Sequence, residues 1–186
     1  MKKDLNSYLQ IYNNIPAELC DSIVSQISNQ PWSPHAFYNA ETKTQTSHHQ
    51  DLEMLLGFAV QENSEVLQLV WDCLMKYLTH FEFSWFNGWS GFSQPRWNRY
   101  KTGTLMKNHC DHIHTLFEGY NKGIPVLSVV GILNDDFEGG ELVMFEDTVV
   151  PCKKGDILIF PSNFLFPHRV DLVTAGTRFS FVSWAW

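Results

Sequence analysis

Two histidines and an aspartate are the residues of this sequence whose types and spacing best suit metal chemistry. His109 and Asp111 are separated only by Cys110. On a β-strand their side chains would point to the same face, because side chains alternate along a strand. A third ligand has to come from elsewhere, and His168, 59 positions after His109, is the best candidate. Two histidines and one carboxylate leave three positions of an octahedron open, which suits a non-haem Fe(II) centre that binds a cosubstrate and O2 together.

Zinc is the alternative metal for this cluster. His112 and His114 extend it to His-Cys-Asp-His-Ile-His, so one of them could replace a ligand, and zinc favours nitrogen and sulfur donors. The other histidines carry no pattern and are expected on the surface: His35, His48, His49 and His80.

Arg178 distinguishes a cosubstrate site from a simple metal site. It follows His168 by ten positions and opens a strand on which Arg178, Ser180 and Trp184 share a face. A buried guanidinium without a partner is costly, and the carboxylate of a ligand would satisfy it through paired hydrogen bonds. The alternatives are that Arg178 pairs with an internal Asp or Glu, or that its face is exposed.

The elements that would position these residues change in character near residue 90. Before it, Leu19, Ile23 and Ile27 recur at a spacing of four after Pro16, and the apolar residues between Asn63 and Phe81 follow a period of 3.6. Both patterns predict helices, the second with Asn63 or Ser64 as its N-cap. The polar stretch 32–50 is expected to be a loop.

After residue 90 the chain consists of short β-branched and aromatic runs separated by turn residues. Candidate strands are 96–100, 105–109, 126–133, 141–145, 156–160 and 178–184. Many short strands without alternating helices predict a barrel or sandwich of antiparallel sheets. We expect a single α+β domain over residues 1–186, mainly β, with residues 1–90 as a mostly helical support and residues 91–186 as the core.

The motifs from Tyr100 onward resemble the prolyl 4-hydroxylase-like branch of the 2-oxoglutarate- and Fe(II)-dependent dioxygenases. Five segments match in the family's order and spacing, over about the last 90 residues: Tyr100-x-x-Gly103, His109-x-Asp111, Leu133-Asn134-Asp135-Asp136-Phe137-Glu138-Gly139-Gly140-Glu141-Leu142, Lys154-Gly155-Asp156-x-x-x-Phe160-Pro161-Ser162 and His168-x-Val170-x-x-Val173-Thr174-x-Gly176-x-Arg178. The resemblance implies a double-stranded β-helix core of the jelly-roll or cupin-like kind, with N-terminal supporting helices.

The resemblance also implies roles for individual residues. Fe(II) would be held by His109, Asp111 and His168, and Arg178 would bind the distal carboxylate of 2-oxoglutarate. Three further residues would line the cosubstrate pocket or lie near the metal: Ser180, Tyr100 and Trp184. Many relatives carry an aromatic residue where this chain has Met106, which leaves open the second residue that assists Arg178.

The implied reaction couples oxidative decarboxylation of 2-oxoglutarate to hydroxylation of an unactivated C–H bond, with a prolyl residue of a protein or peptide as the leading substrate. Its cofactors would be Fe(II) and 2-oxoglutarate, with ascorbate as a further candidate. Because histidines ligate metals only when neutral, metal affinity should fall at acidic pH. The alternatives are the same chemistry on a free amino acid, another small molecule or an alkylated base, and a non-catalytic metal- or ligand-binding β-barrel module.

The amino-acid composition limits the kinds of partner that the protein is expected to bind. With 186 residues and a net charge of -7, bulk attraction to nucleic acid or an anionic membrane is not expected. No apolar run suggests a membrane span or a secretory signal, so a cytoplasmic location is expected. Residues 1–95 carry a net charge of -6, whereas all four arginines lie in residues 96–186: Arg96, Arg99, Arg169 and Arg178. The active face should therefore be locally cationic.

Overall fold

Two antiparallel sheets form most of the fold. The computed structural model describes residues 4–35, 37–39, 44–46, 52–56, 60–82, 88, 90–111 and 125–186. The large sheet has seven strands in the order β1 (Gln10–Asn13), β12 (Asp156–Pro161), β8 (Leu127–Ile132), β15 (Thr177–Ala185), β6 (Arg96–Lys101), β5 (Glu53–Leu56) and β2 (Ser33–Pro34). The small sheet has four, in the order β11 (Thr148–Val149), β10 (Leu142–Met144), β13 (His168–Val170) and β7 (Met106–His109). Two-stranded pairs join β14 (Val173–Ala175) to β9 (Glu138–Gly139), and β3 (Phe37–Asn39) to β4 (Thr44–Thr46).

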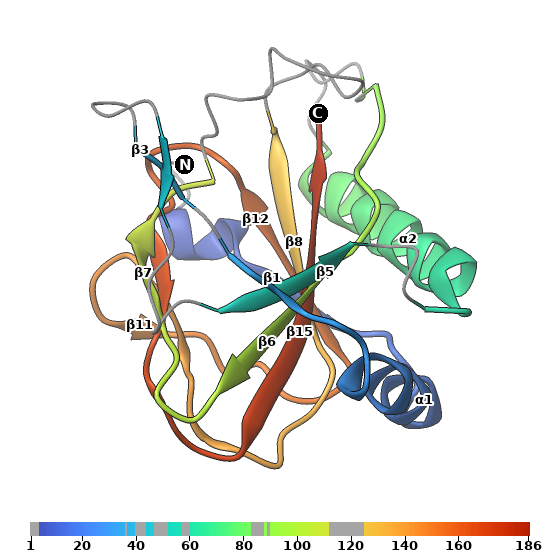
Figure 1. The fold of residues 1–186 in the computed structure, drawn as a ribbon. Helices are drawn as coiled ribbons and strands as arrows, with labels where there is room; N and C mark the ends of the chain where they lie inside the picture. The colour runs from blue at the N-terminus through green and yellow to red at the C-terminus, as the bar shows by residue number, and fades with distance from the viewer. Residues whose placement is uncertain are drawn as a thin grey trace.

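The large sheet packs on both of its faces. Figure 1 shows the helices α1 (Ala17–Ser28) and α2 (Asn63–Phe81) on one side of it and the strands β7 and β11 on the other; a short 3-10 helix, η1, spans Leu5–Tyr8. Ile23, Val70 and Trp97 belong to an outer core beneath the helices. Val130 and Val170 belong to an inner core between the two sheets. The molecule thus has two apolar cores that share one sheet.

Burial on both faces explains the sequence of the central strands. All six residues of β8 are buried, and so are the first five of β12. Such strands are mostly apolar rather than alternating, because neither face meets water. The neighbouring strands β6 and β15 do alternate, and their polar residues, including Asn98 and Ser180, line the space between the sheets. This polar inner surface marks where a ligand would bind.

The two predicted helices are confirmed, and two details of the first half were wrong. α2 is preceded by Glu62, and neither Asn63 nor Ser64 caps it. The carboxylate of Glu62 instead accepts hydrogen bonds from Ser22 and Gln26, which ties the start of α2 to α1. The stretch 32–50 is not only loop, because it contains β2, β3 and β4. These strands are only two or three residues long, which is too short to leave a periodic pattern.

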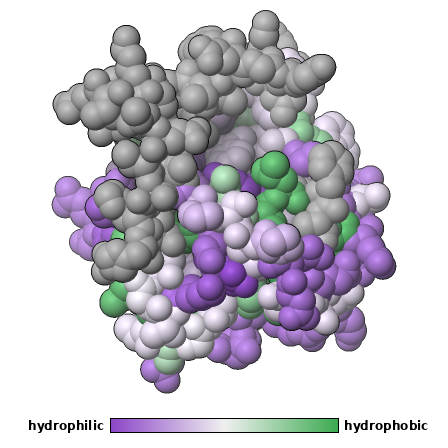
Figure 2. Space-filling view, in the orientation of Figure 1, coloured by the Kyte–Doolittle hydropathy of each residue, from purple (hydrophilic) through white to green (hydrophobic). Residues whose placement is uncertain are grey.

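Most large apolar side chains of the described residues lie in these cores, and a few, such as Leu56 and Phe164, are exposed. In the view of Figure 2, hydrophilic residues cover most of the described surface, and apolar residues form separate small patches. No helix in the described part of the chain is both long and apolar enough to cross a membrane.

Gly131 gives a direct test of how β15 packs on β8. A Cβ at this position would lie 2.0 Å from the ring of Phe181, which is fully buried against Trp97 at 5.6 Å between ring centres. We expect Gly131→Ala to lower the free energy of unfolding by about 1–3 kcal/mol, since the ring has to move within a packed core. Denaturant unfolding measures this change. Gly91→Ala is the control, because its Cβ would meet Trp186 at an ordinary 3.6 Å; equal losses in both variants would contradict the packing argument.

Candidate metal centre

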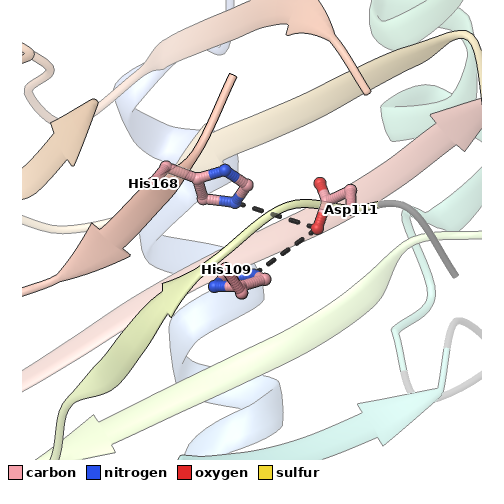
Figure 3. Close-up of side chains that lie close together, drawn as sticks. All are labelled: His109, Asp111 and His168. Atoms are coloured by element: carbon pink, nitrogen blue, oxygen red, sulfur yellow. Dashed lines mark ion pairs between the residues drawn. The ribbon is translucent and has the colours of Figure 1, made fainter. Parts of the chain in front are cut away.

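His109, Asp111 and His168 come together at one end of the small sheet, where β7 ends and β13 begins. His109 is the last residue of β7 and lies opposite His168, the first residue of β13. Asp111 lies in the bend after β7, so its position comes from the bend and not from strand alternation. Its Oδ1 is 3.5 Å from His109 Nε2 and 3.8 Å from His168 Nε2 (Figure 3). One ligand atom from each residue falls within a span of 4.8 Å, which is compact enough for a shared metal ion.

Backbone carbonyls orient both imidazole rings. His109 Nδ1 lies 2.8 Å from the carbonyl oxygen of Lys107, and His168 Nδ1 lies 3.2 Å from that of Phe166. A carbonyl oxygen only accepts, so in the neutral ring Nδ1 carries the proton and Nε2 keeps its lone pair. Both Nε2 atoms face Asp111 (Figure 3). This is how proteins hold histidine ligands toward a metal.

Two serines hold the carboxylate of Asp111. Ser128 Oγ donates to Asp111 Oδ2 at 2.6 Å and lies 2.7 Å from Ser162 Oγ. Both serines are buried. This bond leaves Asp111 Oδ1, the oxygen nearer the histidines, free to bind a cation. Ser128 was not predicted, and its only signal in the sequence is that it is a serine within the apolar run 126–133.

The surroundings of Asp111 and His168 favour the forms of these two residues that bind metal. Burial opposes ionisation of Asp111, but its neighbours His109 and His168 and the hydrogen bond from Ser128 outweigh it and hold the pKa of Asp111 below its ordinary value. Burial lowers the pKa of His168. A charged carboxylate and a neutral imidazole are the forms that bind metal.

Removal of the Ser128 hydroxyl should weaken metal binding without removing a ligand. We expect Ser128→Ala to reduce Fe(II) affinity by about 10–100-fold, the usual effect of losing a group that orients a ligand. Anaerobic Fe(II) titration measures it. Ser183→Ala is the control, because Ser183 is equally buried but bonds Ser93 instead of the triad. Unchanged affinity in Ser128→Ala would show that the bend alone positions Asp111.

Arg178 is a buried cation without an anionic partner in the described chain. Its exposed fraction is 2%, so the exposed-face alternative is wrong. Its Nη1 donates to Ser180 Oγ at 2.9 Å, and its Cζ lies 5.0 Å from the centre of the Tyr100 ring. No carboxylate among the described residues comes within ion-pair distance of it. Burial lowers the pKa of Arg178, and the guanidinium is available for the carboxylate of a ligand.

One cavity is lined by all seven residues to which the family resemblance gives a role. Its lining includes His109, Asp111, His168, Arg178, Tyr100, Ser180 and Trp184. It also includes Met106, where relatives have an aromatic residue, together with Arg96 and Asn98, which were not predicted as site residues. The side-chain contacts of Arg178 are with Ser180 and Tyr100.

Only two of the four arginines reach this cavity. Arg99 Nε bonds Glu53 at 2.7 Å, and Arg169 Nε bonds Asp171 at 2.6 Å, so neither faces it. Among its described lining residues, Arg96 and Arg178 supply the positive charge. Within the described residues, these two arginines therefore account for the cationic face that the sequence suggests.

The remaining histidines divide between the core, the surface and the undescribed residues. His35 was expected on the surface, but it is buried, with its Nε2 3.4 Å from Arg96 Nη1. His80 is exposed, as predicted. The other four lie outside the described residues: His48, His49, His112 and His114. The zinc alternative, in which His112 or His114 would replace a ligand, therefore also depends on residues outside the described ranges.

The donor set fits Fe(II). It consists of two imidazole nitrogens and one carboxylate oxygen, the combination of a facial triad. Cys110 Sγ lies 3.7 Å from the carbonyl oxygen of Phe164, and no thiol belongs to the described cluster.

The second half of the chain matches known proteins in sequence. The sequence model of the 2OG-Fe(II) oxygenase superfamily matches residues 95–186. A PKHD-type hydroxylase of Delftia acidovorans is 37% identical over 48% of this chain and 42% of the relative. Another from Hyphomonas neptunium is 41% identical over 48% of this chain and 42% of the relative. The match thus spans less than half the length of these curated relatives.

Solved structures resemble nearly the whole chain. A prolyl hydroxylase of Trichoplax adhaerens, in complex with a hypoxia inducible factor oxygen degradation domain peptide fragment, has a TM-score of 0.71 at 18% identity and covers 98% of this chain and 85% of its own. A Pseudomonas putida prolyl-4-hydroxylase has a TM-score of 0.64 at 20% identity, with coverages of 96% and 91%. These likenesses confirm the predicted double-stranded β-helix. Through residues 95–186, which contain the triad and Arg178, the chain belongs to the 2OG-Fe(II) oxygenase superfamily.

Proposed function

We propose that the protein is an Fe(II)- and 2-oxoglutarate-dependent dioxygenase that hydroxylates a prolyl residue of a protein or peptide. The observation on which the proposal depends is that the triad lines the same cavity as a buried guanidinium that pairs with no carboxylate of the described residues. A metal site alone would not need Arg178, and an anion site alone would not need the triad. Together they match a cosubstrate that chelates a metal at one end and carries a free carboxylate at the other.

His109, Asp111 and His168 would hold the iron, which when bound supplies the activation of O2 that couples oxidation of 2-oxoglutarate to oxidation of the substrate. Asp111 brings the one negative charge of the triad, and Ser128 holds its carboxylate in place. The described residues of the triad and its supports offer no separate general acid or base. Their role would be to position the metal.

Arg178 would bind the distal carboxylate of 2-oxoglutarate. Ser180 and Tyr100 orient the guanidinium, one by a hydrogen bond and the other by its ring face. Because the site is buried, a charge-assisted pair formed there is worth more than one in water. Trp184 and Met106 line the same cavity and would exclude water from it.

Two findings support a prolyl substrate. The curated relatives are PKHD-type hydroxylases, and the structural neighbours include prolyl hydroxylases, one of them bound to a peptide. We also propose that residues 1–186 act as one domain in which residues 1–90 support the catalytic core. The large sheet supports this proposal, because it combines strands from both halves of the chain: β1, β2 and β5 from the first half and β6, β8, β12 and β15 from the second.

The test is a product screen. The purified chain is incubated with Fe(II), ascorbate and 2-oxoglutarate, with either a proline-rich peptide library or a mixture of metabolites. Succinate and a product heavier by one oxygen atom are then measured by mass spectrometry. We expect both products with peptides, and neither without 2-oxoglutarate. Hydroxylation confined to the metabolite mixture would transfer the chemistry to a small molecule, and the absence of succinate in every reaction would contradict the proposal. Fractionation of cells that express the chain would check the expected cytoplasmic location.

A further inference from the structure

We propose that Arg96 recognises a carboxylate of the primary substrate, so that the enzyme selects peptides with an acidic side chain near the hydroxylated residue. This inference rests on the proposed function and adds a substrate class to it. It concerns Arg96, the second cation of the cavity. The proposed binding of the cosubstrate uses Arg178 and gives Arg96 no role.

Arg96 is fixed in place by neighbours that form no ion pair with it, although the charge of Asp111 acts on it from a greater distance. Its Nε donates to Asn98 Oδ1 at 3.2 Å, and its Nη1 lies 3.4 Å from His35 Nε2. Its Cζ lies 5.1 Å from the centre of the Trp184 ring. None of the acidic residues in the described ranges pairs with it. The guanidinium is thus held by groups other than carboxylates, and its remaining N–H donors are available to a ligand.

Trp184 adds a second donor at the same place. Its Nε1 is buried and finds no acceptor in the described part of the protein. Buried donors are nearly always bonded in native proteins, because an unmade hydrogen bond costs free energy. An oxygen-rich ligand group beside Arg96 would meet this need as well.

The register of the large sheet places Arg96 at the metal end of the cavity. Arg96 lies opposite Val182 on β15, whereas Arg178 lies opposite Tyr100. Four residues of strand separate the two positions, or about 13 Å. On the other side of β15, Trp184 lies opposite Ser128, whose hydroxyl bonds Asp111. Arg96 is therefore beside the triad, where the substrate would react, and Arg178 lies away from it.

The charges of the cavity leave room for one more negative group. Among the described lining residues, Arg96 and Arg178 contribute two positive charges and Asp111 one negative charge. A divalent cation and the dianionic cosubstrate cancel one another. The ternary site would keep a single positive charge, which one substrate carboxylate neutralises. A planar guanidinium suits a carboxylate because it offers parallel N–H groups.

The test measures binding without turnover. In the absence of O2, the protein with Fe(II) and 2-oxoglutarate is titrated into dye-labelled proline-containing hexapeptides. The peptides form matched pairs that differ only in Asp or Asn at one position, which is moved along the peptide. Fluorescence anisotropy gives the dissociation constants. We expect the wild type to bind the best Asp peptide about tenfold or more tightly than its Asn partner.

Three substitutions assign the preference to Arg96. Arg96→Gln should remove the difference between Asp and Asn peptides, and Arg96→Lys should keep part of it because the charge remains but the planar fork is lost. Lys101→Gln is the matched control: it removes the same charge from the same strand, but Lys101 faces Glu53 outside the cavity. This control should keep the full preference. Thermal unfolding checks that all three variants are folded.

Each other outcome overturns the inference in a distinguishable way. Equal binding of Asp and Asn peptides by the wild type, or an unchanged preference in Arg96→Gln, would remove Arg96 from substrate selection. If Arg96→Gln weakens 2-oxoglutarate binding in anaerobic calorimetry as strongly as it weakens peptide binding, the carboxylate at Arg96 is that of the cosubstrate. Competition by L-proline but not by L-prolinamide would assign it to a free acid. In all these cases succinate formation would persist, whereas its absence would show failure of the proposed function itself.

Discussion

Replacement of His168 by alanine is expected to abolish iron-dependent turnover. His168 would supply one of three ligands, and its Nε2 faces Asp111 because Nδ1 is engaged by the carbonyl of Phe166. Loss of a group that merely orients a ligand costs about 10–100-fold in metal affinity, so loss of the ligand itself should cost at least about 100-fold. Anaerobic titration with Fe(II) and succinate formation measure the two consequences.

The matched control for this experiment is His80→Ala. His80 is exposed near the end of α2, so its removal changes the histidine content without touching the triad. Iron affinity and turnover should equal those of the wild type. If His168→Ala retained both, the metal would have to be held elsewhere, and His112 and His114, which the structure leaves undescribed, would become the first candidates.

The triad could be predicted from sequence because its ligands lie in short motifs. His109 and Asp111 are two residues apart, and His168 stands ten residues before an arginine, so local spacing carries most of the information. The helices were predictable for a related reason, since each buries one stripe against the large sheet and leaves a period in the sequence.

Arg96 could not be separated from Arg99 in this way. The two arginines lie on one strand and point to opposite faces of it, one to the cavity and the other to Glu53. Alternation identifies two faces but not which of them is inside, and both faces of β6 carry buried aromatic residues, Trp97 on one and Tyr100 on the other. Tertiary structure is needed to decide between them.

Long-range pairing explains the other omissions. β1 pairs with β12, with Gln10 opposite Ile159, and its residues alternate between partly buried and exposed. Four such residues are too few to distinguish a strand from a loop. The bond from Ser128 to Asp111 likewise joins separate segments and becomes visible only when β8 and the bend after β7 are brought together.

Replacement of Arg178 by methionine is expected to raise the dissociation constant of 2-oxoglutarate by at least about 100-fold, because a buried charge-assisted pair is lost. Anaerobic calorimetry with Fe(II) present measures it. Fe(II) affinity should not change, since Arg178 lies away from the triad. Arg169→Gln is the control, because Arg169 pairs with Asp171 outside the cavity. An unchanged 2-oxoglutarate constant in Arg178→Met would place the cosubstrate elsewhere.

The same substitution should act on stability in the opposite direction. Without a ligand, Arg178 is a buried cation whose described partners are a hydroxyl and an aromatic ring, and burying a charge without an anion is unfavourable. Methionine fills a similar volume without that cost. We therefore expect ligand-free Arg178→Met to unfold at the same or a higher denaturant concentration than the wild type. Added 2-oxoglutarate should stabilise only the wild type, since a ligand stabilises the state that binds it. A ligand-free variant much less stable than the wild type would instead mean that Arg178 holds the two sheets together, and its unpaired charge would no longer indicate a cosubstrate.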